Sequence, residues 1–214
     1  MSITVTMITA VVAGLCALGL TRWMRHVAKV KSTWLVSYLH VILAAAAGAG
    51  AARLADNWAE LVGYTVLGIG CAMLVVVDLA ALRLPNVMVG PLYLLLLGAL
   101  VVATILDRDP LRLLQAVGCA VAMMAVYLLL SVIRRGQLGM GDVKFAGVIG
   151  LFLGWLGWSE ALLGMLAAFA LSGVVAIGML WIWRMGLQLK FPFGPFMVAG
   201  AVVGAAAGPG FLAI

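Results

Sequence analysis

Two aspartates in this chain stand at the ends of apolar segments, where a carboxylate is costly to keep and is usually functional. Asp142 ends the sequence Gly-Met-Gly-Asp, where a basic loop meets an apolar segment, and Asp78 closes the apolar run VVVD. We predict that the two carboxyl groups meet and share one proton between about pH 5 and 7, because low dielectric and mutual repulsion disfavour double ionisation. One can then deprotonate water while the other polarises a carbonyl group, as in aspartic proteases. Because the titration belongs to the pair, neither aspartate receives a fixed role.

Simpler explanations exist for each residue of this pattern. Asp78 alone could be a carboxylate at a helix end that extends to the interface and pairs with Arg83. Gly139 and Gly141 permit positive φ values and close backbone approach, so an extended substrate could lie against them; they are equally explained as a turn at the entry of a helix. Lys144 either tunes the neighbouring carboxylate or anchors the helix at the interface.

The composition indicates where this chemistry takes place. The chain is 66% hydrophobic and 9% charged, with a mean hydropathy of +1.25, whereas a soluble domain carries about 25% charged residues. Its 26 glycines include small-residue runs such as GAGAA, which let membrane helices approach closely. The sequence therefore predicts an all-α, polytopic membrane helical bundle in the lipid bilayer, built as a single domain over residues 1–214. The net charge of +6 does not indicate a nucleic-acid partner, because the cations lie in short loops.

About eight apolar segments come near the length of about 20 residues that a spanning helix needs. They cover residues 3–21, 34–52, 61–79, 87–106, 113–133, 145–158, 161–183 and 196–213. The sixth segment is short, and the seventh follows after only Ser159 and Glu160, so their boundary is the least defined.

The charged residues in the loops predict the orientation of the helices. The loops after the first, third, fifth and seventh segments hold ten of the 13 lysines and arginines. The positive-inside rule places these loops in the cytoplasm and both termini outside. Asp78 and Asp142 are the two acidic residues on the cation-rich side, because the other five lie in or beside the outward loops. The charge pattern thus selects the same two carboxylates as the chemistry does.

The remaining reactive residues do not indicate a metal or cofactor site. His26 and His40 lack metal-ligand spacing, and the three cysteines stand singly, without a CxxC pair. The sequence therefore predicts that the chain uses no metal and no cofactor.

Three motifs follow one another over more than half of the chain. They are D-x4-R-L-P-N from Asp78 to Asn86, G-M-G-D-V-K from Gly139 to Lys144 and F-P-F-G-P-F from Phe191 to Phe196. Together they resemble the type IV prepilin leader peptidases, which are membrane aspartic proteases of the GxGD class. The resemblance implies that Asp78 and Asp142 are catalytic. It also implies a prepilin or pseudopilin substrate, whose basic leader is removed at the cytoplasmic face of the bacterial or archaeal cytoplasmic membrane.

The proline- and glycine-rich third motif also has a counterpart. Pro192, Gly194 and Pro195 resemble the PAL element of presenilin-like GxGD proteases, and broken backbone at membrane depth is tolerated where it lines a cavity or is buried in protein. We expect this segment to border the substrate channel, with the two GxGD glycines and Lys144 shaping the same site.

The first cation-rich loop departs from the family's pattern. Bifunctional members also methylate the new N-terminal residue with S-adenosylmethionine, and they carry an extended loop there, often with two CxxC pairs. The corresponding loop of this chain is about twelve residues, RWMRHVAKVKST, without cysteine. The sequence therefore predicts a short, peptidase-only form that uses no S-adenosylmethionine.

Two other functions stay open. A general GxGD intramembrane protease of the signal-peptide-peptidase type would use the same aspartates, but Val77 rather than a tyrosine precedes Asp78. A non-enzymatic, proton-coupled transporter would use Asp78 and Asp142 as a relay, although no inverted half-repeat is evident in the sequence. The oligomeric state is not indicated.

Overall fold

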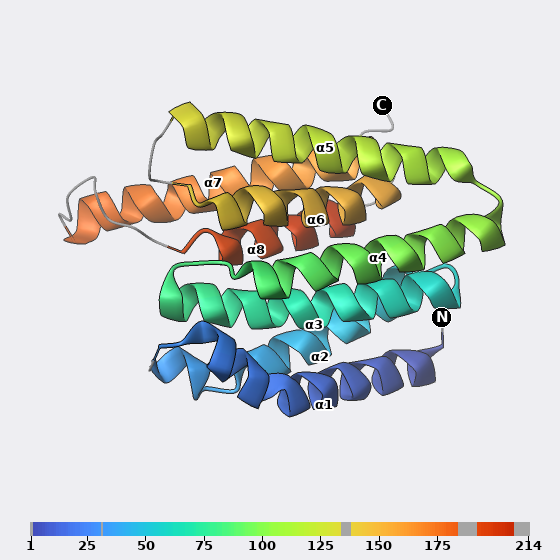
Figure 1. The fold of residues 1–214 in the computed structure, drawn as a ribbon, viewed down its shortest axis with the longest axis horizontal. Coiled ribbons are helices and arrows are strands. Elements are labelled where there is room, and N and C mark those ends of the chain that lie inside the picture. The colour runs from blue at the N-terminus through green and yellow to red at the C-terminus, as the bar shows by residue number, and fades with distance from the viewer. Residues whose placement is uncertain (1, 31, 134–137, 184–191, 208–214) are drawn as a thin grey trace. The chain divides into compact units, whose positions relative to one another are not determined.

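The computed structural model describes residues 2–30, 32–133, 138–183 and 192–207, and within these residues the regular elements are all helices, without strands (Figure 1). The predicted all-α bundle is thereby confirmed. The elements are α1 (Ile3–Ala28), the 3₁₀ helix η1 (Thr33–Leu35), α2 (Leu39–Leu54), α3 (Trp58–Ala81), α4 (Asn86–Asp107), α5 (Pro110–Ile133), α6 (Met140–Leu156), α7 (Trp158–Trp183) and α8 (Gly194–Ala207). Five of them, α1, α3, α4, α5 and α7, are long and apolar enough to cross a membrane.

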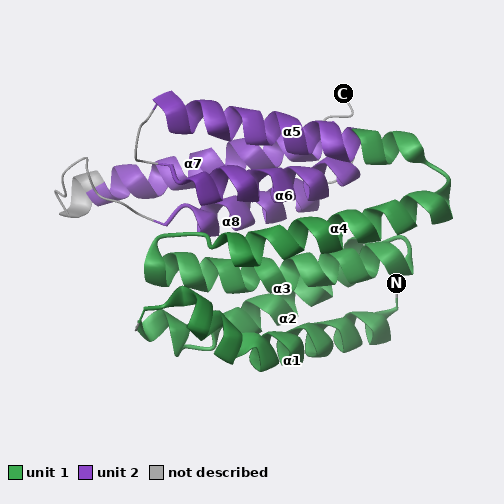
Figure 2. Cartoon of the chain, viewed as in Figure 1, with its two compact units in different colours: residues 1–114 green, residues 115–214 purple. Residues whose placement is uncertain are grey.

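The chain divides into two compact units (Figure 2). Unit 1 comprises residues 1–114 and unit 2 comprises residues 115–214. Asp78 belongs to unit 1, and Asp142 belongs to unit 2.

Small residues hold the helices of unit 1 together. Each of α1 to α3 packs against the next helix in the chain, and α1 also contacts α3. A Cβ atom on Gly48 of α2 would lie 2.6 Å from the Thr9 carbonyl oxygen of α1, and one on Gly68 of α3 would lie 2.6 Å from the Ala47 Cβ of α2. Because neither space accepts a side chain, glycine sets the distance between these helices.

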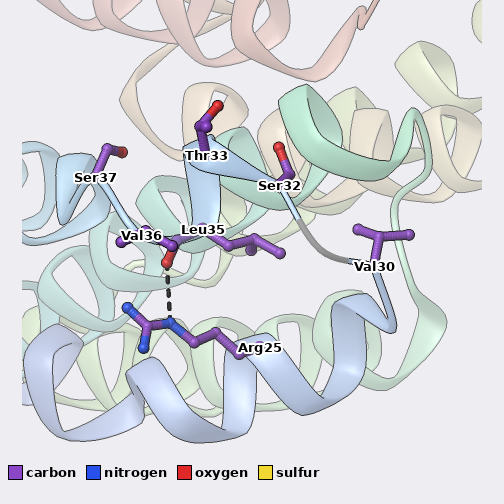
Figure 3. A pocket seen from close by; sticks show the side chains of 7 residues that line it. All are labelled: Arg25, Val30, Ser32, Thr33, Leu35, Val36 and Ser37. Atoms are coloured by element: carbon purple, nitrogen blue, oxygen red, sulfur yellow. Dashed lines mark hydrogen bonds between the residues drawn. The ribbon is translucent and has the colours of Figure 1, made fainter.

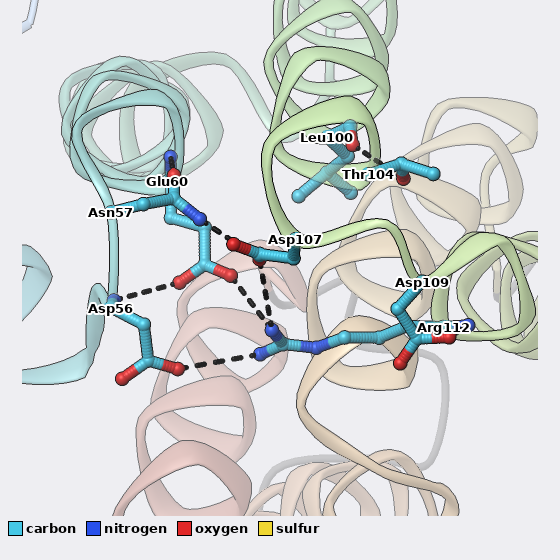
Figure 4. Close-up of polar contacts among 8 residues, drawn as sticks. All are labelled: Asp56, Asn57, Glu60, Leu100, Thr104, Asp107, Asp109 and Arg112. Carbon is cyan, nitrogen blue, oxygen red and sulfur yellow. Dashed lines mark hydrogen bonds and ion pairs between the residues drawn. The ribbon is translucent and has the colours of Figure 1, made fainter.

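A buried ion pair joins the ends of three helices in unit 1 (Figure 4). Glu60, in the first turn of α3, is 0% exposed, and its Oε1 lies 2.9 Å from Arg112 Nη1 of α5. Its Oε2 accepts a hydrogen bond from the Asp56 backbone N–H at 2.9 Å. Asp107, the last residue of α4, accepts from Asn57 Nδ2 at 3.0 Å and lies 3.8 Å from Arg112.

In unit 2, α5 and α6 run side by side in one antiparallel register. A Cβ atom on Gly150 would lie 2.8 Å from Ala120 Cα, and one on Gly154 would lie 3.0 Å from Ala116 Cα. Both pairs fit the same alignment of the two helices. Gln115 strengthens it, because its Nε2 donates a hydrogen bond to the Gly154 carbonyl oxygen at 2.9 Å.

Glycines also bring α7 and α8 together. A Cβ atom on Gly200 of α8 would lie 2.7 Å from the Ala168 backbone nitrogen of α7 and would also collide with the Gly164 carbonyl oxygen. One on Gly204 would lie 3.0 Å from Gly164 Cα. This contact fixes α8, the helix that begins within the third motif.

The predicted segment 34–52 is not one helix. The Ser32 hydroxyl accepts a hydrogen bond from the Trp34 N–H, and the Ser37 hydroxyl donates one to the Trp34 carbonyl, so the chain first forms the short turn η1. Tyr38 then adopts a left-handed conformation with φ of 52°, and α2 begins only at Leu39. Local side-chain hydrogen bonds therefore override the apolar pattern here.

Other boundaries also differ from the prediction. α1 continues to Ala28, seven residues past its apolar segment, and α6 begins at Met140 rather than at residue 145. Between α6 and α7, Gly157 is the single connecting residue, and a Cβ atom there would collide with the Glu160 carboxylate. The predicted segment 196–213 continues beyond α8, and residues 208–213 lie outside the described part of the chain.

Candidate active site

The GxGD sequence forms the N-terminus of α6. Gly139 precedes the helix, and its carbonyl oxygen accepts from the N–H groups of Asp142, at 3.0 Å, and Val143, at 3.3 Å. In return, the Gly139 N–H donates to Asp142 Oδ2 at 2.9 Å. The carboxylate thus satisfies a backbone donor at the positive end of the helix dipole, where a negative charge is favoured.

Gly139 stands in the turn that enters α6 and does not adopt a positive φ, and whether a substrate lies against these glycines stays a prediction. Gly139 has φ of −77°, an angle open to any residue, but a Cβ atom there would lie 3.1 Å from Asp142 Oδ2. Gly141 lies within the first turn of α6. Lys144 lies on the same helix and is exposed.

Two opposing effects act on the Asp142 carboxyl, which precedes the apolar segment 145–158. Burial raises its pKa above the ordinary value of 3.8 because the charged form loses hydration. The hydrogen bonds from the backbone N–H groups of Gly139 and Asp142 lower the pKa, and burial is the larger effect. Asp142 therefore holds a proton more readily than a solvated aspartate does.

The described part of the third motif also lies in unit 2. Pro192 and Phe193 precede α8, and Gly194 and Pro195 open it, where proline costs no helical hydrogen bond. Gly194 is buried, and the Phe193 carbonyl oxygen accepts from the Phe196 N–H at 3.0 Å. Phe191 lies outside the described residues.

Unit 2 adds one residue that the sequence reasoning missed. Tyr127 of α5 is 1% exposed and interacts electrostatically with Asp142. Its ring centroid also lies 5.9 Å from that of Phe193. The available signal was a single phenol in an otherwise apolar segment, which does not by itself indicate which helix face it occupies.

Asp78 lies in the last turn of α3 in unit 1, and its residue is 3% exposed. The helix ends there because Leu82 adopts a left-handed conformation and donates its N–H to the Asp78 carbonyl oxygen at 2.8 Å. Arg83 contacts the end of α1, where its Nη2 donates to the Ala28 carbonyl oxygen at 2.8 Å. The burial of Asp78 argues against the alternative in which its carboxylate extends to the membrane interface.

The predicted site residues therefore fall into two groups. Asp142, its glycines, Lys144 and the described third motif belong to unit 2, whereas Asp78 belongs to unit 1. The convergence of Asp78 and Asp142 stays a prediction.

A cleft of about 800 Å³ in unit 1 contains none of the predicted site residues (Figure 3). It is lined by Arg25, Val30, Ser32, Thr33, Leu35, Val36 and Ser37. The guanidinium of Arg25 is engaged within the protein: its Nε donates to the Leu35 carbonyl at 2.9 Å, and it lies 5.7 Å from the centre of the Tyr38 ring. This arginine thus ties η1 to α1. Among the residues that the structure describes, no group of three or more metal-ligating side chains gathers.

Comparison with known proteins places this chain in a family. Two relatives named prepilin leader peptidase/N-methyltransferase, from Burkholderia pseudomallei strains 1026b and K96243, are each 38% identical over 63 residues, which are 29% of this chain and 19% of the relative. Leader peptidase HopD of Escherichia coli is 41% identical over 72 residues, or 33% of this chain and 45% of the relative. The chain thus matches less than half the length of each of these relatives, and no solved structure matches it.

The family match itself is longer and contains both aspartates. The model of the type IV leader peptidase family matches residues 65–182, which is more than half of the chain and includes Asp78 and Asp142. The chain therefore belongs to the type IV leader peptidase family.

Proposed function

We propose that this chain hydrolyses the peptide bond between the leader and the mature part of a prepilin or pseudopilin, and that Asp78 and Asp142 together activate the water. One observation carries the proposal: Asp78 lies in the last turn of α3, Asp142 lies in the first turn of α6, and α4 and α5 stand between them in the chain. Both intervening helices are long and apolar enough to cross a membrane. If both helices cross the membrane, the chain returns to the side from which it started, which supports placing both aspartates at the same membrane face.

The pair performs hydrolysis by exchanging one proton. The ionised carboxylate removes a proton from water, whose oxygen attacks the carbonyl carbon of the scissile bond. The protonated carboxyl donates to the carbonyl oxygen, and the C–N bond breaks as the departing amine takes up a proton. Neither role is assigned to one residue, because two interacting carboxyls titrate as a pair.

The substrate and the membrane face follow from the relatives and the charge pattern. Two relatives are named prepilin leader peptidase/N-methyltransferase. A short, basic leader stays on the cytoplasmic side of the membrane, so the active site that removes it should lie there too. Ten of the 13 cations lie in loops that the positive-inside rule assigns to the cytoplasm. We therefore place the site at the cytoplasmic face of the cytoplasmic membrane.

The relatives from Burkholderia also carry the name N-methyltransferase, and we propose that this chain lacks that activity. α1 ends at Ala28 and η1 begins at Thr33, so only residues 29–32 connect them. This connection is shorter than the twelve-residue loop that hydropathy indicates. It leaves little chain for binding S-adenosylmethionine.

The test uses the full chain in detergent with a purified prepilin. Asp78→Asn and Asp142→Asn should each reduce cleavage at least a hundredfold, about the lower limit for loss of general acid–base catalysis. Asp56→Asn is the matched control, because its side chain is 78% exposed and only 3.9 Å from Arg112. Its activity should stay within about twofold of the wild type, since exposed ion pairs contribute little.

Wild-type activity in either Asn variant would remove that aspartate from the mechanism. The wild-type pH profile should be bell-shaped, and a chelator should leave the rate unchanged. Loss of activity with chelator and its return with added metal would indicate a metalloprotease instead. Proton-driven transport by liposomes that contain the chain, without cleavage of any prepilin, would favour the transporter.

A further inference from the structure

Tyr127 is level with Asp142 across the α5–α6 contact. In the register set by Ala120 with Gly150 and Ala116 with Gly154, residue 127 faces residue 143, next to Asp142. The negative charge of Asp142 acts on the Tyr127 side chain, which agrees with this placement. The register of the two helices therefore places Tyr127 beside the GxGD turn.

The same ring lies in a cluster of aromatic side chains. Its centroid is 5.1 Å from that of Phe169 on α7 and 5.9 Å from that of Phe193, and Phe169 and Phe193 are 5.7 Å apart. Tilted aromatic rings at these distances stabilise the fold by more than the burial of their apolar surface alone would. Phe193 is the residue from which α8 begins, since its carbonyl accepts from the Phe196 and Met197 N–H groups. The cluster thus holds the third motif against α5 and α7.

We propose that Tyr127 is the positioning residue that joins the GxGD aspartate to the proline- and glycine-rich segment. Its hydroxyl supplies a polar neighbour to the Asp142 carboxylate at the buried side of the turn, and its ring anchors Phe193. The expected effect of Tyr127 on cleavage rests on the proposed function. The expected effect of Tyr127 on the titration of the Asp142 carboxyl group does not depend on that function.

Few other charged groups act on Asp142 from the described part of unit 2. α5 contributes Tyr127 and Cys119, α6 contributes Lys144, α7 contributes Glu160 in its first turn, and α8 has no ionisable residue. Cys119 and Glu160 lie toward the other end of α6, since Cys119 and Gly154 are in contact and Glu160 directly follows Gly157 and Trp158 in the chain. Lys144 and Tyr127 are therefore the ionisable neighbours to consider.

Two variants separate the hydroxyl from the ring. Tyr127→Phe removes the hydroxyl and keeps the aromatic cluster, whereas Phe169→Leu removes a ring of the cluster and keeps the hydroxyl. The measured quantity is the pH at which the Asp142 side-chain carbon titrates, by NMR of the full chain labelled with ¹³C at the aspartate carboxyls. The chain has five aspartates, and Asp142→Asn assigns the resonance.

We expect Tyr127→Phe to move the Asp142 titration to higher pH by about half a unit or more, because the ionised form loses a polar partner. Phe169→Leu should leave the titration in place and lower the unfolding temperature. In the cleavage assay, Tyr127→Phe should reduce kcat about tenfold and leave KM unchanged. The pH dependence of the rate should shift to higher pH. An unchanged titration in Tyr127→Phe overturns the proposal.

The two proposals fail in different ways. If Asp142→Asn cleaves prepilin normally, the proposed function fails and the NMR titration still tests Tyr127. If Asp142→Asn is inactive but Tyr127→Phe has the wild-type titration and profile, only the role of Tyr127 is lost. Should Tyr127→Phe fold poorly, Tyr127→His retains a ring with a polar edge and should restore part of the wild-type titration, whereas an equal shift in both variants contradicts the role of the polar group.

Discussion

Arg112 Nη1 lies 2.9 Å from Glu60 Oε1, and Glu60 has no exposed surface. The pair joins the start of α5 to the start of α3, at the end of α3 opposite to Asp78. A buried carboxylate is costly unless it is paired and hydrogen-bonded, and Glu60 is both. Within unit 1, the pair therefore holds the first turn of α5 against the first turn of α3.

Removal of one partner of this pair should be strongly destabilising. Arg112→Leu leaves Glu60 buried without its cation, and we expect a loss of about 3–5 kcal/mol in the free energy of unfolding. Arg53→Leu, an exposed cation in the same region, should change it by less than about 0.5 kcal/mol. Denaturant unfolding in detergent measures both. The double variant Glu60→Gln/Arg112→Leu should recover part of the loss, and equal stability of Arg112→Leu and the wild type would contradict the assignment.

Gly139→Ala should disturb Asp142 without disturbing the helix. The backbone angles at Gly139 suit alanine, but the new Cβ atom would lie 3.1 Å from Asp142 Oδ2, so the carboxylate must shift by a few tenths of an ångström. We expect cleavage to fall about tenfold with little change in stability. Gly173→Ala is the control, because a Cβ atom there meets nothing within 4 Å. Equal activity of the two variants would show that the position of Asp142 is not critical.

The raised pKa of Asp142 predicts how stability depends on pH. A carboxyl whose pKa is higher in the folded chain stabilises the fold most below its unfolded value near 3.8, and this contribution is lost as the pH rises through the raised pKa. Asp142→Asn does not titrate and keeps an oxygen for the Gly139 N–H. The unfolding free energy of the wild type should therefore decline as the pH rises above about 4 and through the raised pKa, and the variant should lose part of this decline. If the two curves stay parallel, burial does not control this carboxyl.

The contact between α7 and α8 should not accept a side chain at Gly200. The Cβ atom of Gly200→Val would lie 2.7 Å from the Ala168 nitrogen and would strike the Gly164 carbonyl, and backbone atoms cannot move aside as a flexible side chain can. We expect a loss of about 1–3 kcal/mol, typical of overpacking. Gly178→Val lies on α7 where a Cβ atom meets nothing within 4 Å, and its unfolding temperature should stay close to that of the wild type.

Apolar length predicted where helices exist but not where they begin. Apolar runs end where the bilayer ends, whereas a helix continues as long as its hydrogen bonds do, so α1 extends through Arg22 and Arg25 to Ala28. α5 begins at Pro110, before its apolar run, because proline suits the first turn of a helix. The break at Tyr38 depends on hydroxyl hydrogen bonds of Ser32 and Ser37, which hydropathy does not register.

The sequence singles out the residues of the candidate site but gives little of their geometry. The motif spacing identified Asp142, yet the capping bond from Gly139 shows that the same carboxylate also stabilises its helix. Tyr127 could not be found from the sequence, because its place beside Asp142 depends on the α5–α6 register, which the close contacts of Gly150 and Gly154 set.

The Gly139 N–H donates a hydrogen bond to Asp142 Oδ2. The same oxygen therefore caps α6 and belongs to the carboxyl group of the proposed mechanism. Any ligand that binds this oxygen must compete with the Gly139 N–H. When the ligand displaces that donor, the first turn of α6 loses one of its stabilising hydrogen bonds. Occupancy would then be visible as fraying: faster hydrogen exchange at Gly139 and Val143, the amides at this helix start, in a chain whose other helices stay protected.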